Sequence, residues 1–566
     1  MASAKISHFQ QSAKEKAAGF RHAFSSKEAF LKYVQNPESV NETDPERARW
    51  TNRDLDPTPP EQRNWNWFNY CTYYFGLSFG NWTLGSSMIG IGLNWWQSIV
   101  VIFISQMIAS TAMLYNSKAA STYHIGYPCV ARSVYGMWGS YYPVGARAVL
   151  AIIWYAVQLY TGASYLSNML QAIFGHHYTD IPNGMPESMG FTTQQMLGFF
   201  LFWLIHIPFV FLRPYQLRGF FSFKSAISFP AMLGLFIYCM ATTKGKLGSL
   251  YDGSAPSGGQ FGWFFMWCIN SGMGNTATLI TNQPDLARWA KTTKSPTWAQ
   301  MIVNPVFTTL SATLGILATS AVNNKWGTSI WNQWDLMTAI MERNWRPEVR
   351  FAVFLCACCW MISILATNIA ANMIPFGADS SMLWPKYLTI TRGQAIVHLL
   401  GYAVCPWKIM YSASTFVTFL AGYGIFMGPV VAIMICEYYL VSRGNVFIPS
   451  LYIGNKNNEN YWYKGGWNVQ AFIAYIVAIA LPFPGFVGTL GPKVSTAAEN
   501  LGHLGWCLSF VIAFVIYYLL NLVWPHENVK NTKGLRREEL ADIGVVEGVE
   551  TGTPTEELSV SLSEKK

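Results

Sequence analysis

Long runs of apolar residues, separated by short polar connections, make up most of the sequence from residue 68 onward. An α-helix rises about 1.5 Å per residue, so about 20 apolar residues cross a bilayer core of roughly 30 Å. The runs therefore predict membrane-spanning helices. We expect twelve of them, at residues 68–93, 95–117, 146–174, 195–212, 219–241, 260–281, 299–322, 349–374, 394–407, 412–441, 468–490 and 502–524.

The composition supports this prediction. Of the 566 residues, 51% are hydrophobic and 12% are charged, whereas about 25% are charged in soluble domains. The net charge of +9 does not indicate a nucleic-acid partner, because the basic residues lie mostly in the tails and short connections. The ten cysteines lack metal-ligand spacing. No phosphate-binding loop or catalytic constellation is evident, so we expect an integral membrane protein that is not an enzyme.

Charge also predicts the orientation of the chain. Twelve spans place both tails on one side, and the connections on that side carry more Lys and Arg than the opposite ones, although the 323–348 loop is an exception. Excess positive charge marks the cytoplasmic side. The expected organisation is a cytoplasmic tail (1–66), a transporter core (67–441), two further spans with their preceding loop (442–525) and a second cytoplasmic tail (526–566).

Two spans carry glycine and polar residues in their middle. The first contains five glycines and Asn81-Trp-Thr83, and the sixth contains Gly272 and Gly274 just before Asn275. Unwound backbone at this depth is tolerated only where it lines a cavity or meets a ligand. These spans are the first helices of two five-helix halves (about 68–241 and 260–441), and matching interruptions indicate a midplane transport site. The alternative is that the glycines allow close helix packing.

Polar faces on the third and eighth spans indicate the ligand. Trp154 and Gln158 lie one helical turn apart in a stretch without charged residues, and Asn368 and Asn372 lie one turn apart among small residues. An indole face holds a planar ring, and amides hydrogen-bond its edge. The alternative is packing of the Trp and Gln and amide pairing between helices.

Several motifs resemble the nucleobase–cation symporter family 1, in particular its fungal uracil/allantoin permease (Fur-type) branch. They occur in the family's order within about residues 50–525 and include Trp154-Tyr-Ala-Val-Gln158, Asn282-Gln-Pro-Asp285-Leu-Ala-Arg288 and Thr367-Asn368-Ile-Ala-Ala-Asn372. The resemblance implies an all-α, LeuT-like membrane fold of five-plus-five inverted repeats with two additional C-terminal helices. It also implies that Trp154 stacks on a heterocycle and that Gln158 and Asn372 bind its edge.

The predicted substrate shell joins these residues to the two interrupted spans. It consists of Trp154, Gln158, Asn372, Asn368, Thr83, Asn275 and Gly272.

Three departures from the family pattern bear on coupling and substrate. Sodium-coupled bacterial members have neighbouring Ser and Thr hydroxyls before the first Asn of the eighth helix, whereas this chain has Ala366-Thr367. The missing hydroxyl disfavours sodium, and we expect the proton as coupling ion, with no cofactor and no metal. Thr83 stands where uracil-type members place Gln, and Ala378 stands where many fungal members carry Asn. The loss of these two amides favours a larger or differently substituted ring over uracil.

Charged residues near the ends of the spans are candidates for gating or proton coupling. They are Asp54, Arg147, Lys291 and Asp285. We expect Asp54 to pair with Arg147 or Lys291 and so to close the inner mouth. The alternative is a static interfacial cluster, because surface ion pairs are common and weak.

Together these features predict a proton-coupled plasma-membrane importer of a small planar heterocycle such as uracil, allantoin or uric acid. Thiamine, uridine or nicotinamide riboside are alternative substrates, and a sensor without transport is a less favoured alternative. The expected partners are the substrate and the lipid bilayer, with no nucleic acid. Lys, Ser and Thr in the tails lead us to expect contacts with a ubiquitin-ligase adaptor.

Overall fold

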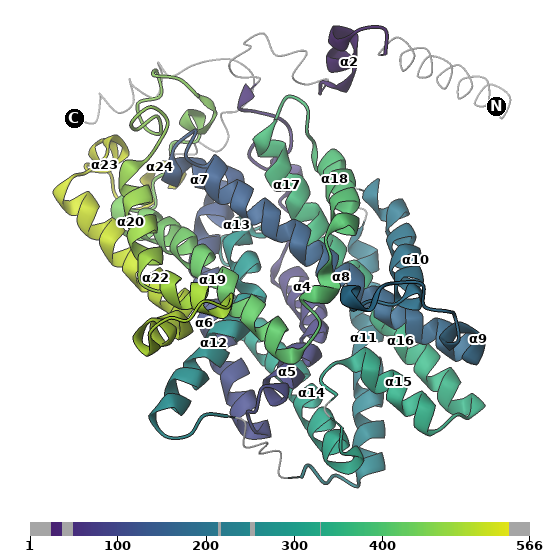
Figure 1. Cartoon of the computed structure of the whole chain (residues 1–566). Coiled ribbons are helices and arrows are strands. Elements are labelled where there is room, and N and C mark those ends of the chain that lie inside the picture. The colour runs from purple at the N-terminus through teal and green to yellow at the C-terminus, as the bar shows by residue number, and fades with distance from the viewer. Residues whose placement is uncertain (1–23, 37–48, 213–216, 249–254, 329, 543–566) are drawn as a thin grey trace, which may run out of the picture.

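The fold was obtained as a computed structural model that describes residues 24–36, 49–212, 217–248, 255–328 and 330–542. Within these ranges the protein is helical, and its only β-structure is two isolated bridges. The helix next to the N-terminal tail, α2 (Lys27–Val34), and the last one, α24 (Glu539–Asp542), lie at the same end of the helix bundle (Figure 1).

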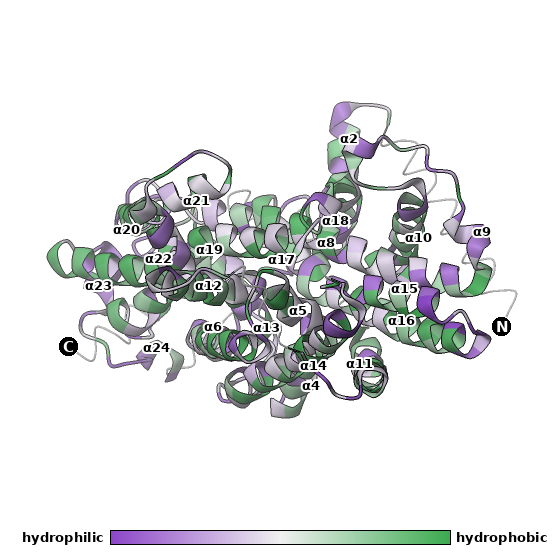
Figure 2. Cartoon of the chain, turned by 60° about the horizontal axis from the view of Figure 1, so that its bottom comes forward, coloured by the Kyte–Doolittle hydropathy of each residue, from purple (hydrophilic) through white to green (hydrophobic). Residues whose placement is uncertain are grey.

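Each predicted apolar run coincides with helix. The elements are α4–η3–α5 (Trp67–Gly90), α6 (Trp95–Tyr123), α8 (Tyr141–Phe174), α10 (Thr193–Val210), α11 (Arg218–Thr243), α12 (Gly259–Thr281), η6–α14 (Ala299–Trp326), α16–η7–α17 (Pro347–Leu383), α18 (Ile390–Ala403), α19–η9 (Ala413–Val441), α20 and α21 (Val469–Ala480 and Phe483–Thr489) and α22 (Thr496–Val523). Hydrophobic residues follow the long helices, and hydrophilic residues gather in the connections (Figure 2).

Within the described ranges, eight helices are long and apolar enough to cross a membrane, or nine if the bent pair α20–α21 forms one span. The first, sixth and ninth predicted spans are not among them. The first is divided by η3 into helices of 12 and 9 residues, and α18 of the ninth has 14 residues. The sixth, α12, carries polar residues in its middle, which lower its hydropathy. The count of twelve spans therefore stays a prediction.

The first span is interrupted, as predicted. Helix α4 (Trp67–Ser78) passes into the 3₁₀ turn η3 (Phe79–Asn81) before α5 (Trp82–Gly90) continues. A 3₁₀ turn in the middle of a helix often marks a functional hinge. Close contact with α14 holds α5 in place, because a Cβ at Gly85 would lie 2.6 Å from the carbonyl oxygen of Ala312.

The expected interruption of the sixth span was wrong: α12 is continuous through Gly272 and Gly274. The glycines serve close packing instead. A Cβ at Gly272 would lie 2.4 Å from Ser105 Oγ on α6, and one at Gly274 would lie 2.0 Å from the carbonyl oxygen of Leu420 on α19. Small residues let helix backbones approach in a membrane, which was the alternative interpretation.

The eighth span is longer and less regular than predicted. After α16 (Pro347–Asn368) the chain forms one π-helical turn, η7 (Ile369–Met373), and then continues as α17 (Ile374–Leu383). Single π turns occur frequently at functional sites. This turn begins directly after Asn368 and contains Asn372, two residues of the predicted substrate shell.

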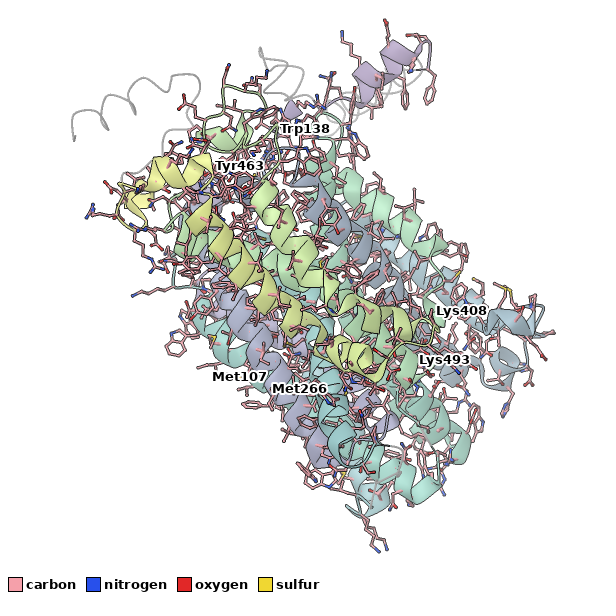
Figure 3. The ribbon with its side chains drawn as sticks, turned by 60° about the vertical axis from the view of Figure 1, so that its left-hand side comes forward. Met107, Trp138, Met266, Lys408, Tyr463 and Lys493 are labelled. Atoms are coloured by element: carbon pink, nitrogen blue, oxygen red, sulfur yellow. The ribbon has the colours of Figure 1, made fainter. Side chains whose placement is uncertain are left out.

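The connection between α19 and α20 packs against α7 (Tyr127–Tyr135) and the start of α8. Trp138 N–H donates to the carbonyl oxygen of Gly466 (2.9 Å), and Tyr463 Oη donates to that of Ser133 (2.6 Å). Figure 3 shows Trp138 and Tyr463 near one end of the molecule, away from Lys408 and Lys493. The end that carries α2 and α24 is thus built largely from connections rather than from spans.

Candidate functional site

Trp154 lies in the middle of α8 and is 7% exposed. Two aromatic residues of α19 contact it: Phe419, with ring centroids 5.8 Å apart, and Tyr423, whose hydroxyl accepts a hydrogen bond from Trp154 Nε1 at 3.2 Å. The Tyr423 hydroxyl in turn donates to the carbonyl oxygen of Gly274 on α12. The indole is therefore held between α8, α12 and α19.

Gln158 lies one turn further along α8. Its side-chain oxygen is buried and has no hydrogen-bond partner among the described residues. Leaving such a group unpaired costs about 1–3 kcal/mol. An N–H group of a ligand would satisfy this oxygen one helical turn from the Trp154 indole, as the predicted role requires.

The two asparagines of the eighth span have different surroundings. Asn368 is fully buried; its Nδ2 donates to the backbone oxygen of Tyr155 at 3.1 Å, and its Oδ1 accepts from Asn372 Nδ2 at 2.9 Å. Asn368 thus joins the eighth span to α8 next to Trp154, so amide bonding between helices, the alternative interpretation, holds for this residue. The Oδ1 of Asn372 accepts no hydrogen bond from the described residues.

The remaining predicted shell residues lie around the break in the first span. Asn275 Nδ2 donates to Asn81 Oδ1 at 2.8 Å, which links α12 to η3. Thr83 lies in the first turn of α5 and is 8% exposed. The Gly272 carbonyl oxygen accepts from Gln106 Nε2 at 3.1 Å, and its Cα faces α6. The role of Gly272 as a substrate contact stays a prediction.

The expected pairing of Asp54 with Arg147 was also wrong. Arg147 is 1% exposed and forms an ion pair with Asp379 of α17, which is fully buried. A buried guanidinium needs a partner at its own depth, and Asp379 supplies it. The carboxylate of Asp54 instead accepts from the backbone N–H of Ile390 at 3.0 Å, where the first turn of α18 leaves N–H groups unpaired.

The other two predicted gate residues lie nearby but do not form the expected pair. Lys291 is exposed and has no ion pair in the described part of the chain. Asp285 Oδ1 accepts from the backbone N–H of Tyr127 at 2.8 Å, at the start of α7. Burial raises the pKa of Asp285, and the positive charge of Arg147 opposes this shift.

The segment just before the first span closes the same end of the protein. Arg288 donates to Thr58 Oγ1 (2.7 Å) and to the backbone oxygens of Asp54 (2.8 Å) and Asp56 (2.5 Å). Further along this segment, Trp65 forms a parallel bridge with Ala290. Residues 49–66, which the sequence analysis placed in the N-terminal tail, therefore pack against the helices at the end that carries α2 and α24.

Sequence reasoning missed two residues of this region, Phe419 and Tyr423. They stand one turn apart in a strongly apolar span, where aromatic residues normally indicate packing. Their position against Trp154 depends on which helices become neighbours, and no sequence pattern showed that.

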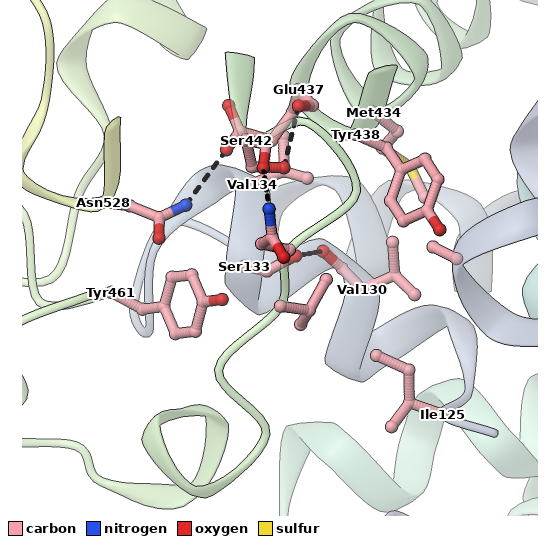
Figure 4. Close-up of a pocket in the computed structure, with 13 residues that line it drawn as sticks. Ile125, Val130, Ser133, Val134, Met434, Glu437, Tyr438, Ser442, Tyr461 and Asn528 are labelled. Carbon is pink, nitrogen blue, oxygen red and sulfur yellow. Dashed lines mark hydrogen bonds between the residues drawn. The ribbon is translucent and has the colours of Figure 1, made fainter. Parts of the chain in front are cut away.

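A separate small cavity lies outside this site (Figure 4). Residues of α7, of the end of α19 and of the C-terminal segment line it, among them Ser133, Glu437, Ser442 and Asn528. The Glu437 carboxylate accepts hydrogen bonds from Tyr517 Oη (2.7 Å) and Asn528 Nδ2 (3.2 Å). The polar groups at this cavity largely satisfy one another.

Long apolar helices and an interrupted first span are the features of a multi-pass membrane protein. Residues 57–509 match the family model described as "Permease for cytosine/purines, uracil, thiamine, allantoin", and the chain belongs to this family.

Curated relatives cover most of the chain. It is 36% identical over 485 residues to an allantoin permease of Saccharomyces cerevisiae, covering 84% of this chain and 76% of the relative. It is 30% identical over 524 residues to a uracil permease of the same organism, covering 90% and 82%. The family predicted from the motifs is confirmed.

Two solved structures show the same fold. Mhp1, a nucleobase-cation-symport-1 family transporter, in a closed conformation with bromovinylhydantoin bound, superimposes with a TM-score of 0.61 at 21% identity, covering 86% of this chain and 99% of Mhp1. The inward-facing conformation of Mhp1 gives a TM-score of 0.64 at 20% identity, covering 88% and 99%. The predicted all-α, LeuT-like fold is confirmed.

Proposed function

We propose that this permease imports a small planar heterocycle of the nucleobase class across the plasma membrane together with protons. The observation that carries the proposal is the unpaired, buried side-chain oxygen of Gln158, one turn from the Trp154 indole. Pyrimidine and hydantoin rings have N–H groups in the ring plane, so one ring can stack on the indole and donate to this oxygen. Asn372 Oδ1 offers a second acceptor.

The arrangement also supports a gating mechanism. Phe419 and Tyr423 cover Trp154 from α19, while the Arg147–Asp379 pair and residues 49–66 close the end that carries α2 and α24. Alternating access requires these two closures to open in turn. The positive charge of the connections at this end supports a cytoplasmic position for both tails.

The substrate within the class follows from side-chain size. Thr83 and Ala378 are smaller than the amide residues expected at a uracil site. Smaller side chains at these positions favour a substituted ring, and the similarity to an allantoin permease agrees with this preference. Uracil, uric acid, uridine, thiamine and nicotinamide riboside remain as comparison substrates.

Radiolabelled uptake tests the proposal in cells that lack endogenous permeases. We expect Trp154→Ala to abolish uptake at a normal surface level, whereas Trp298→Ala, at a tryptophan that is 63% exposed, leaves uptake unchanged. Wild-type affinity in Trp154→Ala would overturn the assignment of the site. Binding without uptake for every compound would indicate a sensor.

Uptake measured in the presence of a protonophore tests the coupling ion separately. We expect it to abolish accumulation in the wild type, while replacing sodium with choline in the medium has no effect. Uptake that requires sodium and resists the protonophore would overturn proton coupling but leave the substrate site intact.

A further inference from the structure

A buried histidine of α10 lies directly behind the asparagines of the eighth span. His206 is fully buried, and α10 packs against both α8 and α18 (Figure 1). Its ring nitrogen Nδ1 lies 3.0 Å from the carbonyl oxygen of Phe202, one turn earlier in the same helix. Its other nitrogen, Nε2, lies 3.4 Å from Asn368 Nδ2. The imidazole therefore connects the backbone of α10 to an asparagine of the predicted substrate shell.

The partners of His206 fix the tautomer of its ring. A carbonyl oxygen only accepts hydrogen bonds, so Nδ1, which faces the oxygen of Phe202, carries a hydrogen and donates it. Asn368 Nδ2 donates to the backbone oxygen of Tyr155 and is therefore the amide nitrogen, itself a donor. Two donors do not bond to each other, so Nε2 carries no hydrogen and accepts from Asn368.

These two acceptors fix the direction of both asparagine amides. The backbone oxygen of Tyr155 and Nε2 of His206 take the hydrogens of Asn368 Nδ2, so Asn368 Oδ1 points the other way and accepts from Asn372 Nδ2 at 2.9 Å. Asn372 thus turns its nitrogen towards Asn368, and its oxygen is left for the substrate. A chain of hydrogen bonds that starts at a backbone carbonyl of α10 therefore makes Asn372 an acceptor.

The second polar group of the site is an acceptor as well. The side-chain oxygen of Gln158 is buried and has no partner among the described residues. A ring with two N–H groups can donate to this oxygen and to Asn372 Oδ1. A methyl group on either ring nitrogen removes one donor and leaves a polar group of the site unpaired, which is how such sites reject close analogues.

A second histidine in the same layer lacks the connection to the asparagines. His398 of α18 is 5% exposed, and its ring centroid lies 6.3 Å from that of His206. Its Nδ1 bonds to Tyr155 Oη at 2.9 Å, whereas its Nε2 is buried and has no partner in the described part of the chain. The two histidines thus share their surroundings and differ in the partner of Nε2.

We propose that His206 is a positioning residue that sets the hydrogen-bond polarity of the substrate site and so selects rings that carry N–H groups. This inference rests on the import of a planar heterocycle proposed above. His206 acts through Asn368 on Asn372 and not on the substrate itself. Without its Nε2, the backbone oxygen of Tyr155 alone holds the Asn368 amide, and Asn372 is held less firmly with its oxygen towards the ring.

The test compares two substitutions of His206 that differ in reach. The amide of Asn stands as far from Cβ as Nδ1 does, so His206→Asn can bond to Phe202 but not to Asn368. The amide of Gln reaches the place of Nε2, so His206→Gln can present its oxygen to Asn368. His398→Asn is the matched control, because the nitrogen that it loses has no partner in the described structure.

The full-length variants are expressed in cells that lack endogenous permeases, and uptake of radiolabelled allantoin and uracil is measured. Unlabelled hydantoin and its two mono-N-methyl derivatives compete for this uptake, and their inhibition constants give the preference for N–H at each ring nitrogen. We expect His206→Asn to lower this preference by up to about tenfold, the value of one hydrogen bond, at one ring nitrogen only. His206→Gln and His398→Asn should keep the wild-type preference at both nitrogens.

An unchanged preference in His206→Asn, or an equal loss in His206→Gln, would overturn the positioning role and leave the proposed import standing. The same holds for a wild type that binds hydantoin and its methyl derivatives equally well. A wild type that takes up neither labelled compound would overturn the proposed function together with this inference. If His206→Asn does not reach the cell surface, His206→Leu replaces it, because an apolar side chain suits a spanning helix and also lacks the acceptor; the same loss is expected.

Discussion

The substitution Gly274→Ala tests whether the glycines of α12 serve packing or an unwound binding segment. The added Cβ would lie 2.0 Å from the carbonyl oxygen and 2.5 Å from the carbonyl carbon of Leu420. These are backbone atoms of α19 and cannot rotate away. Because ordinary contact begins near 3.4 Å, the two helices must separate locally by about 1.4 Å.

Two opposing terms set the size of the effect. Overpacking of this kind costs about 1–3 kcal/mol, and replacing glycine by alanine inside a helix gains about 1 kcal/mol. Gly262→Ala in the same helix has the favourable helix-propensity term without the overpacking term, since no atom lies within 4 Å of its added Cβ. We therefore expect Gly274→Ala to be less stable than Gly262→Ala by about 1–3 kcal/mol.

Thermal unfolding of the purified variants in detergent measures this difference, and uptake measures its consequence. The separation moves Tyr423 away from the carbonyl oxygen of Gly274 and from Trp154, so we expect weaker apparent substrate affinity in Gly274→Ala alone. Equal stability of the two variants would refute the packing explanation and restore the interpretation of an unwound segment.

Three further substitutions follow from the site. Asp379→Asn leaves the buried guanidinium of Arg147 without a negative partner, which costs about 3–5 kcal/mol; a wild-type yield of folded protein in size-exclusion chromatography would contradict this. Tyr423→Phe removes the hydroxyl that bonds both to Trp154 and to α12, at a cost of about 0.5–1.5 kcal/mol. We therefore expect the KM of uptake to change by up to about tenfold. An unchanged KM would show that these two hydrogen bonds are dispensable. Asn372→Ala should abolish uptake at a normal surface level, whereas Asn368→Ala should also lower the surface level because it joins two helices; equal effects in both assays would refute this division of roles.

The helices and the class of protein were predictable because they depend on properties of short segments. An apolar run must form a helix in a membrane, where each backbone polar group needs an internal partner, and the runs coincide with helices throughout the described ranges. The break after Ser78 was predictable for a similar reason, since Phe79-Gly-Asn81 combines glycine with a polar residue. The proximity of Trp154, Asn368 and Asn372 followed from the motifs of the family.

The sequence alone could not show which residue faces which. Gly272 and Gly274 have the composition of an unwound segment, and only the backbones of α6 and α19 beside them show that they serve packing. Several acidic residues were possible partners of Arg147. The structure pairs it with Asp379, which is buried at the same depth, whereas Asp54 bonds to the start of α18.

The sequence by itself determined the membrane class, the helices, the family and the candidate pair Trp154 and Gln158. Only the tertiary structure decided that α19 covers Trp154, that Asn368 serves the helix contact, and that His206 bonds to Asn368. The physical reason is the distance along the chain over which each interaction acts. Hydrophobicity and helix formation act within about 20 residues of chain, whereas a hydrogen bond between buried groups depends on helices that meet from distant parts of the sequence.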